Sequence, residues 1–552
     1  MRVADFFCGA GGFSEGFRQA GFEIVFAVDK WEPAINTFKA NKPSCRVLQD
    51  DVVRISRLPE NEFHTLIPDT EVILGSPPCV AFSNSNKSGN GDKSLGIELV
   101  RAFFRIVARK RFKPNSILRY WVLENVPNIK KYIQEKYSAA DLGLNGDFNL
   151  TPINKSTGIY NAKYFGAPTN RKRFLCGEFP KPQMTNTDEN IKTLRVVLTS
   201  LGEPCNNTNR VIQDSNYQGF CLPKNELTDH YYLYMLQPFE WETAKRLKED
   251  KGYMGKMSFP ENLDRPARTV MATMSENSRE SMILPVRQGG YRLPTVREVS
   301  SMMSFPIDYR FYGKSKGIKH TLVGNAVPPK MAYAIAKAIL LEANERIQSK
   351  YIPIKHDKAI PFMDLNYIRF APKIEQPKKI IAKFKYHIPY MIVNAYRVEL
   401  TNYHSDFDSK EFKWSVEIHY SQGKDRARVF CPIIRPGLWD KGLLKKWDKF
   451  INSTVLKMCK SYNRFQEIYC MASEERISGN YIGPFELLNL VKEYIDKNID
   501  NTSSNEQMYI SDELPNIPRV IGVGCYLLSQ LIAPMGQIVN ISVSMNRKRK
   551  LK

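Results

Sequence analysis

The sequence predicts an α/β protein: a mostly parallel sheet, an inserted irregular module and a C-terminal mixed α/β domain. Over the first 130 residues, short apolar runs alternate with segments of helical period, as expected for parallel strands joined by crossover helices. From about residue 180 to 265 Asn, Thr, Asp and Lys dominate and no long periodic segment is visible. Helical periodicity returns after residue 294.

The expected elements of the sheet follow one another closely. Strands are predicted at Arg2–Phe6, Glu23–Val28, Arg46–Leu48, Val72–Gly75 and Tyr120–Leu123. Helices are predicted at Gly12–Ala20, Glu32–Asn41, Gly96–Arg109, Thr295–Ser304 and Lys330–Ile347. Ligands of such sheets bind beyond the carboxyl ends of the strands, so the residues that follow each strand are the first candidates for a functional site.

These patterns divide the chain into four parts. Residues 1–180, continued by residues 265–347, form the α/β core, and residues 181–264 form the inserted module. Residues 348–380 carry several prolines and lysines and are predicted to be a linker. Residues 381–552 form the C-terminal domain.

The composition favours a polyanionic partner and no membrane. The net charge is +23, of which residues 351–552 contribute +10 from 31 basic and 21 acidic side chains. Such an excess favours nucleic acid, although charge can also serve solubility alone. The sequence contains no long apolar run and no signal peptide, so we expect a cytoplasmic, nucleoid-associated protein with no membrane partner.

A glycine-rich turn follows the first strand and opens the next helix. It reads Phe7-Cys8-Gly9-Ala10-Gly11-Gly12-Phe13. Glycines let the backbone approach a ligand closely, and a helix N-terminus favours an anionic group. Asp29 ends the second strand, where an acidic residue can bond ribose hydroxyls. The alternative role for Asp29 is a helix N-cap.

A cysteine follows the buried strand Val72–Gly75 in the motif Pro77-Pro78-Cys79. An isolated cysteine is most often a packing residue. Here two prolines hold the thiol away from the sheet at the edge where ligands bind, which favours a chemical role. The thiol needs help to ionise near neutral pH, because its ordinary pKa is about 8.5.

Two further motifs are candidates for the same edge. Glu124-Asn125-Val126 closes the strand Tyr120–Leu123, so we expect the Glu124 carboxylate to face the crevice that holds Cys79. Asn170-Arg171-Lys172-Arg173 contains alternating arginines, which point the same way if the segment is extended. Taken singly, the glutamate could also cap a helix or pair with a lysine, and the arginines could be an ordinary basic stretch.

Together these motifs resemble the cytosine-5 DNA methyltransferase family over roughly residues 1–345, in the family's order. Arg265-Pro266-Ala267-Arg268-Thr269-Val270 and Gly324-Asn325-Ala326-Val327-Pro328-Pro329 match the last two motifs. Three positions depart from the pattern. Val80 follows the cysteine where Gln is usual, Thr169 replaces a common Gln before the arginines, and Lys93 stands where Arg is frequent.

The resemblance implies a Rossmann-like sheet that binds S-adenosylmethionine, releases S-adenosylhomocysteine and uses no metal. It implies cofactor contacts from the glycine turn, the strand ends, the cysteine loop and the last motif: Phe7, Cys8, Gly9, Ala10, Gly11, Gly12, Phe13, Asp29, Lys30, Asp51, Val52, Pro77, Asn325 and Ala326. Asp29 falls where the family contacts the ribose, and Asp51 where it contacts the adenine. Residues 181–264 fall where the family keeps its target-recognition region.

The resemblance assigns the chemistry to Cys79, Glu124, Arg171 and Arg173. The thiolate of Cys79 adds to carbon 6 of cytosine and makes carbon 5 nucleophilic, while Glu124 hydrogen-bonds or protonates nitrogen 3. Arg171 is expected to hold the base and Glu124, with Arg173 in support or on a phosphate. The cytosine must be flipped out of the duplex, under a mobile lid at Val80–Lys93.

The implied partner is double-stranded DNA with a specific sequence. Because the motifs begin at residue 5, we expect a bacterial enzyme of a restriction-modification or other defence system, with a cognate endonuclease or further subunits as possible partners. Two alternatives stay open. An RNA methyltransferase can use the same scaffold, and a non-catalytic nucleic-acid-binding protein can keep the fold. The inserted module favours DNA, and the four catalytic residue types favour an enzyme.

The C-terminal domain matches none of these motifs. Its acidic residues include Asp406, Asp408, Glu417 and Asp440, but the sequence does not assemble them into the two-carboxylate-plus-lysine cluster of a nuclease. A fused endonuclease, a module that binds DNA or a partner, and a packing extension all remain open.

Replacing Cys79 by serine is expected to abolish methyl transfer while DNA and cofactor binding persist, because a hydroxyl group is a poor nucleophile near neutral pH. A rate above about a tenth of wild type, a barrier change below about 1.4 kcal/mol, would contradict the assignment. DNA carrying 5-fluorocytosine at the target should trap the enzyme on Cys79, because fluorine cannot leave as the proton does. Mass spectrometry should find the adduct on no other residue.

Overall fold

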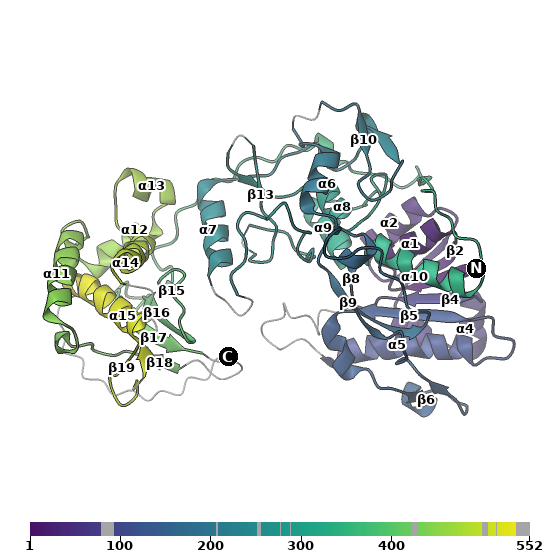
Figure 1. Cartoon of the computed structure of the whole chain (residues 1–552), viewed down its shortest axis with the longest axis horizontal. Helices are drawn as coiled ribbons and strands as arrows, with labels where there is room; N and C mark the ends of the chain where they lie inside the picture. The colour runs from purple at the N-terminus through teal and green to yellow at the C-terminus, as the bar shows by residue number, and fades with distance from the viewer. Residues whose placement is uncertain are drawn as a thin grey trace. The chain divides into compact units, whose positions relative to one another are not determined.

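The computed structural model describes residues 1–78, 93–205, 208–250, 255–276, 278–287, 289–421, 428–499, 506–514 and 516–536 (Figure 1). The chain forms two compact units. The first comprises residues 1–236 and 259–372, and the second comprises residues 237–258 and 373–552. Cys79 and the expected lid, apart from Lys93, lie outside the described residues.

A seven-stranded sheet is the framework of the first unit, in the order β3-β2-β1-β4-β5-β9-β8. Its strands are β1 (Arg2–Phe6), β2 (Glu23–Asp29), β3 (Arg46–Gln49), β4 (Val72–Gly75), β5 (Tyr120–Asn125), β8 (Gly158–Asn161) and β9 (Lys172–Glu178). The first five pair in parallel, as the sequence predicts, whereas β9 is antiparallel to both β5 and β8. The sheet is therefore mixed and dominated by parallel strands.

Helices cover both faces of this sheet (Figure 1). One face carries α1 (Gly12–Ala20) and α10 (Pro329–Glu342), and the other carries α3 (Val52–Ser56), α4 (Glu60–Leu66) and α5 (Lys93–Arg111). Val3 of β1 packs in one core with Phe17 and Ile335, whereas Phe6 packs in another core with Phe103. Alternate residues of one strand thus enter opposite layers, because successive side chains of a strand point to opposite faces.

The helices differ from the sequence prediction mainly at their ends. α2 (Glu32–Asn41) and α1 have the predicted bounds, whereas α5 begins three residues before Gly96 and α10 stops five residues before Ile347. α8 (Val296–Met302) lies within the helix expected at Thr295–Ser304. The structure adds α3, α4 and α9 (Lys316–Asn325), which are short or poorly periodic.

The antiparallel strand β9 decides where the arginine motif lies. Asn125 of β5 is the register partner of Phe174, and Glu124 is the partner of Leu175. Because β9 runs opposite to β5, its first residues lie beside the carboxyl end of β5. Arg173 is thereby brought to the edge of the sheet where the glutamate motif ends.

The rest of the first unit packs around a further core. It contains α6 (Leu194–Leu201), α8, α9 and the short strands β10 (Val211–Gln213), β11 (Cys221–Pro223), β12 (Met235–Leu236), β13 (Leu284–Pro285) and β14 (Tyr291–Arg292). Residues 348–372, where the sequence predicts a linker, pack against this unit. Ile354 and Leu365 are buried in its core, and Asn366 Oδ1 accepts the backbone N–H groups of His230 and Tyr231.

The second unit is built around an antiparallel sheet in the order β15-β16-β17-β18. The strands are β15 (Lys385–His387), β16 (Tyr396–Thr401), β17 (Ser415–Tyr420) and β18 (Arg428–Phe430). The helices are α7 (Pro238–Glu249), α11 (Lys441–Val455), α12 (Tyr462–Cys470), α13 (Ser473–Ser478), α14 (Pro484–Asn498) and α15 (Arg519–Ile532). α7 comes from residues expected in the inserted module; just after it, Asp250 accepts the hydroxyl of Tyr386.

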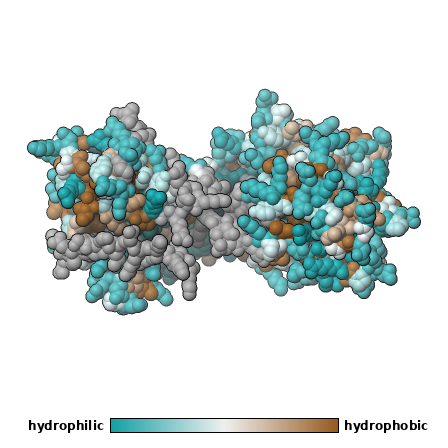
Figure 2. Space-filling model, turned by 90° about the horizontal axis from the view of Figure 1, so that it is seen from below, coloured by the Kyte–Doolittle hydropathy of each residue, from teal (hydrophilic) through white to brown (hydrophobic). Residues whose placement is uncertain are grey.

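No helix in the described part of the chain is long and apolar enough to cross a membrane. On the face that Figure 2 shows, most coloured residues of the first unit are hydrophilic, and apolar residues form small patches among them. A hydrophilic surface of this kind agrees with the 25% of charged residues in the sequence.

The contact between α1 and α10 leaves no room for a side chain at Gly16. A Cβ there would lie 2.4 Å from the carbonyl oxygen of Pro329 and 2.5 Å from Cβ of Ala332. Gly16→Ala is therefore expected to lower the free energy of unfolding of the first unit by about 1–3 kcal/mol, measured as a lower melting temperature.

Gly317→Ala is the matched control. A Cβ at Gly317 would meet only the Ser315 hydroxyl, at 3.9 Å, and alanine should stabilise the first turn of α9. Equal melting temperatures for the two variants would contradict the packing argument.

Candidate active site

Glu124 lies at the carboxyl end of β5 with its carboxylate enclosed by protein. Its side chain is 5% exposed, and Arg173 Nε lies 2.8 Å from its Oε1. The hydroxyl of Ser76, directly after β4, donates a hydrogen bond of 2.6 Å to its Oε2. A buried carboxylate loses its hydration and depends on such donors. The two donors therefore fix the carboxylate in one orientation at the edge of the sheet.

Asn125 ties this strand end to the segment that leads into the cysteine motif. Its Nδ2 donates to the carbonyl oxygen of Pro77 at 3.0 Å, and the side chain is buried. Pro77 is followed by Pro78 and Cys79. The structure thus brings the glutamate motif and the cysteine motif together as far as Pro78, and Cys79 itself lies outside the described residues.

In the described part of the chain, the two arginines bond to different groups. The family resemblance assigns Glu124 to Arg171, whereas among the described residues Arg173 makes the ion pair with Glu124. The reason is the start of β9. Just before β9, the backbone N–H of Asn170 donates to the carbonyl oxygen of Ala267 at 2.7 Å. Arg171, the next residue, therefore lies beside the segment that contains Ala267. Only within β9 does the strand run beside β5.

Arg171 instead joins the last two motifs of the chain's first unit. Its Nη1 donates to the carbonyl of Val270 at 2.9 Å, and its Nη2 donates to the carbonyls of Gly324 and Ala326 at 2.9 and 3.1 Å. The side chain is 2% exposed. Buried backbone carbonyls need hydrogen-bond donors. Arg171 supplies them and so links segments that are distant in the sequence.

The glycine turn is open on one side and tightly packed on the other. Gly9 and Gly11 have φ values of +51° and +80°, which glycine adopts without strain. A Cβ at Gly9 would meet nothing within 4 Å, whereas a Cβ at Gly12 would lie 2.2 Å from the carbonyl oxygen of Val327. Since α1 begins at Gly12, its N-terminus opens at this turn.

Asp29 fastens the turn from the end of β2. Its Oδ2 accepts the N–H of Gly9 and its Oδ1 accepts the N–H of Trp31, both at 2.9 Å. Burial raises the pKa of its carboxyl, and the backbone donors oppose this. α2 begins at Glu32 with Trp31 as its N-cap residue, so Asp29 precedes the helix instead of capping it.

The other predicted cofactor residues differ in exposure and in their contacts. Lys30 is exposed, and its Nζ lies 3.0 Å from Oδ2 of Asp51. The other oxygen of Asp51 caps α3 by accepting the N–H of Val53 at 2.8 Å. Asn325 is exposed at the end of α9. The buried positions are Cys8, Ala10, Gly11, Gly12, Phe13, Val52, Pro77 and Ala326, and Phe7 is partly buried.

Two buried side chains that no sequence motif marks, Lys42 and Tyr309, bond the backbone of the glycine turn. Lys42 Nζ lies 3.3 Å from Glu15 Oε2 and 3.4 Å from the carbonyl oxygen of Gly11. It also donates to the hydroxyl of Tyr309 at 3.0 Å, which itself donates to the carbonyl of Ala10 at 2.5 Å. Burial lowers the pKa of Lys42, and the Glu15 carboxylate opposes this shift.

Asp5 is a further buried polar group beneath the turn. It is fully buried in β1, and the hydroxyl of Ser14 donates to its Oδ2 at 2.5 Å. Burial raises the pKa of Asp5 to about 7, while the Ser14 hydrogen bond opposes the shift. No local signal identifies Lys42 or Tyr309, because these two residues, which bond each other, are 267 positions apart in the sequence.

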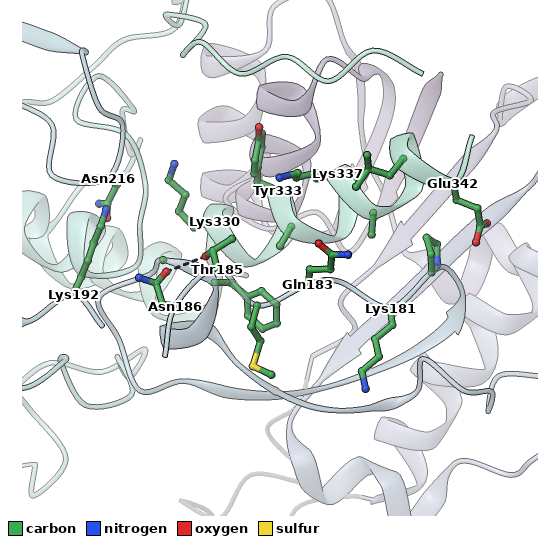
Figure 3. A pocket seen from close by; sticks show the side chains of 17 residues that line it. Lys181, Gln183, Thr185, Asn186, Lys192, Asn216, Lys330, Tyr333, Lys337 and Glu342 are labelled. Atoms are coloured by element: carbon green, nitrogen blue, oxygen red, sulfur yellow. Dashed lines mark hydrogen bonds between the residues drawn. The ribbon is translucent and has the colours of Figure 1, made fainter. Parts of the chain in front are cut away.

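A pocket of about 560 Å³ lies elsewhere in the first unit, between residues 180–192 and α10 (Figure 3). Figure 3 shows Lys192 and Lys330 on two of its walls. Burial, together with the positive charge of Lys192, lowers the pKa of Lys330 to about 8. None of its lining residues belongs to the glycine turn or to the partners of Glu124.

Comparison with known proteins agrees with the motifs. The sequence profile of the family described as C-5 cytosine-specific DNA methylase matches residues 1–341. Type II methyltransferase M.MthTI of Methanothermobacter thermautotrophicus is 29% identical over 61% of this chain and 97% of its own length. Type II methyltransferase M1.HphI of Haemophilus parahaemolyticus is 28% identical over 62% of this chain and 88% of its own length.

Among solved structures, a putative DNA modification methyltransferase encoded in a prophage of E. coli aligns with 62% of this chain and all of its own, at 22% identity and a TM-score of 0.40. The family profile ends at residue 341, so the C-terminal residues of the second unit lie beyond it. Because the profile matches more than half of the chain, the protein belongs to the C-5 cytosine-specific DNA methylase family and is a DNA cytosine-5 methyltransferase.

Proposed function

We propose that this enzyme methylates carbon 5 of a cytosine flipped out of a specific duplex DNA sequence, with S-adenosylmethionine as the cofactor and Cys79 as the nucleophile. The observation that carries the proposal is the fixed carboxylate of Glu124, which lies beside the segment that leads to Cys79 in the sequence. A preorganised acid next to a nucleophile loop at the carboxyl edge of a parallel sheet is what attack on a cytosine ring requires.

The glycine turn fits S-adenosylmethionine. Open space at Gly9 lets the cofactor lie against the backbone, and the N-terminus of α1 suits its carboxylate. Each oxygen of Asp29 accepts one backbone N–H and can accept a second donor, such as a ribose hydroxyl. Asp51, 39% exposed at the end of β3, suits the adenine amino group. When bound, the cofactor supplies an electrophilic methyl group on a sulfonium.

The chain's own residues then act on the cytosine ring. The thiolate of Cys79 forms a bond to carbon 6, and the electron density passes to carbon 5. Glu124 hydrogen-bonds or protonates nitrogen 3 and offsets the negative charge of the ring. Loss of the carbon 5 proton after methylation expels Cys79 and restores the aromatic ring. The whole sequence needs a flipped base, because neither ring atom is reachable within a duplex.

Arg173 is the positioning residue for Glu124 in this scheme. Its guanidinium fixes one carboxylate oxygen, and Ser76 fixes the other. Arg171 has an indirect role, because its hydrogen bonds hold the last two motifs together. This exchanges the roles that the sequence suggests for the two arginines.

We also propose a place in restriction-modification or another defence system, supported by the names of the type II relatives. Residues 181–264 remain the proposed target-recognition region. Transfer of a labelled methyl group from S-adenosylmethionine to duplex DNA, with transfer RNA as the competing substrate, tests the proposal. Methylation of transfer RNA alone would overturn it, and base-resolution mapping of 5-methylcytosine would give the site.

The two arginines should respond differently to replacement by lysine. Arg173→Lys keeps the charge but loses the fixed Nε contact with Glu124, so turnover should fall at least about tenfold with little change in melting temperature. Arg171→Lys should lower the free energy of unfolding by about 1–3 kcal/mol, because carbonyls lose their donors. Single-turnover methylation and thermal melting measure both effects. The reverse pattern would show that Arg171 is the catalytic partner after all.

Lys42→Met should weaken S-adenosylmethionine binding about tenfold, because the turn loses a charged donor to the Gly11 carbonyl. The fold should survive, since Glu15 keeps Arg18 as a partner at 2.8 Å. Lys39→Met, an exposed lysine in the last turn of α2 and three residues before Lys42, is the matched control. Calorimetry that finds equal cofactor affinity for the two variants would reject the supporting role of Lys42.

A further inference from the structure

Two buried glutamates lie directly opposite each other in the sheet of the second unit. Glu399 of β16 is the register partner of Glu417 of β17. Their neighbours Val398 and Ile418 enter the core, so the two glutamates occupy the other face of the sheet, where they are 5% and 4% exposed. Like charges directly opposite across a strand pair destabilise a sheet. The cluster therefore needs positive charge between the two carboxylates.

His419 brings a third ligand atom to the same point. Its Nε2 lies 2.9 Å from Oε2 of Glu399 and 2.8 Å from Oε2 of Glu417. A single N–H can be directed at only one of these oxygens, and the hydrogen bond is made with Glu417. Oε2 of Glu399 is buried and receives no hydrogen bond from the described residues. The two Oε2 atoms and the imidazole nitrogen thus lie close together, with His419 Nε2 within 2.9 Å of both oxygens.

The outer oxygens of both carboxylates are held from outside the cluster. Arg397 Nε donates to Oε1 of Glu399 at 2.5 Å, and His404 Nε2 lies 2.7 Å from Oε1 of Glu417. Outer partners of this kind orient metal-ligating carboxylates, and they leave the two Oε2 atoms turned inward.

We propose that Glu399, Glu417 and His419 form a divalent-cation site in the second unit, separate from the methyltransferase site. Their ligand atoms lie within 4.8 Å of one another. An octahedral cation with bonds of about 2.1 Å places neighbouring ligand atoms about 3.0 Å apart. The nitrogen–oxygen distances of 2.8 and 2.9 Å match that spacing. A tetrahedral zinc site would space them about 3.4 Å apart.

The class of cation follows from the ligands. Two carboxylate oxygens suit hard cations such as Mg²⁺ and Mn²⁺, and an imidazole nitrogen shifts the preference towards a transition metal. Mn²⁺ satisfies both conditions in octahedral geometry. The family resemblance implies no metal for methyl transfer. The proposed site serves the second unit, where the ion would bridge β16 and β17.

The role of Lys385 distinguishes a cation site from a simple ion-pair network. Its Nζ lies 3.1 Å from Oε2 of Glu417 and 3.4 Å from Oε2 of Glu399, and its side chain is 30% exposed. In a self-contained network Lys385 is the bridging charge and its loss exposes the repulsion of the two glutamates. In a cation site its ammonium competes with the ion and can move out to solvent.

The test titrates the full chain, freed of metal by a chelator, with MnCl₂ and follows free Mn²⁺ by electron paramagnetic resonance. We expect one site per chain in the second unit, weakened about 10- to 100-fold by Glu399→Gln or Glu417→Gln. Lys385→Met should bind Mn²⁺ at least as tightly as wild type. Lys383→Met, an exposed lysine just before β15, should have no effect.

Folding is followed by tryptophan fluorescence, because four of the six tryptophans lie in the second unit: Trp241, Trp414, Trp439 and Trp447. Mn²⁺ should raise the melting temperature of wild type and of Lys385→Met. Spin-echo modulation from an imidazole nitrogen should appear with bound Mn²⁺ and needs no variant, so it tests the site even if a glutamine variant fails to fold.

Three results would overturn the proposal. The first is no Mn²⁺ binding by the intact chain below about 1 mM. The second is a folded Glu399→Gln variant with the affinity of wild type. The third is a Lys385→Met variant that loses its fold and is not restored by Mn²⁺, which would identify the cluster as an ion-pair network.

Discussion

The site depends on one buried ion pair, between Glu124 at the end of β5 and Arg173 at the start of β9. A carboxylate in this place needs a fixed positive partner, because protein has replaced the water around it. The antiparallel register of β9 supplies that partner. Ser76 completes the arrangement from the neighbouring strand end, so three segments that are distant in sequence position one carboxylate.

The glycine turn after β1 is held in a comparable way. Its glycines leave one side open for a ligand, and the other side rests on polar groups that the fold has buried. Lys42 and Tyr309 bond the carbonyls of Gly11 and Ala10, and Glu15 balances the lysine charge. A turn without side chains cannot stabilise itself by its own packing. Its shape is therefore determined by a helix end and by a segment near residue 309.

The second unit repeats the theme of buried charge without a reaction assigned to it. Glu417 is visible in the sequence as one acidic residue among several, yet its partner Glu399 and the neighbouring Lys385 are separated from it by loops and strand turns. Antiparallel pairing places them on one face of a sheet. Two carboxylates and a lysine do come together there, which the sequence by itself did not show.

The sequence determined the parallel strands, most helices of the core and the family, because apolar period, glycine turns and motif order are local signals. β1, α1 and β4 have the predicted bounds for this reason. Only the tertiary structure decided that Arg173 pairs with Glu124, that Lys42 bonds the glycine turn, and that Glu399 faces Glu417. Each of these contacts depends on strand register or on packing between distant segments, which residue periodicity does not encode.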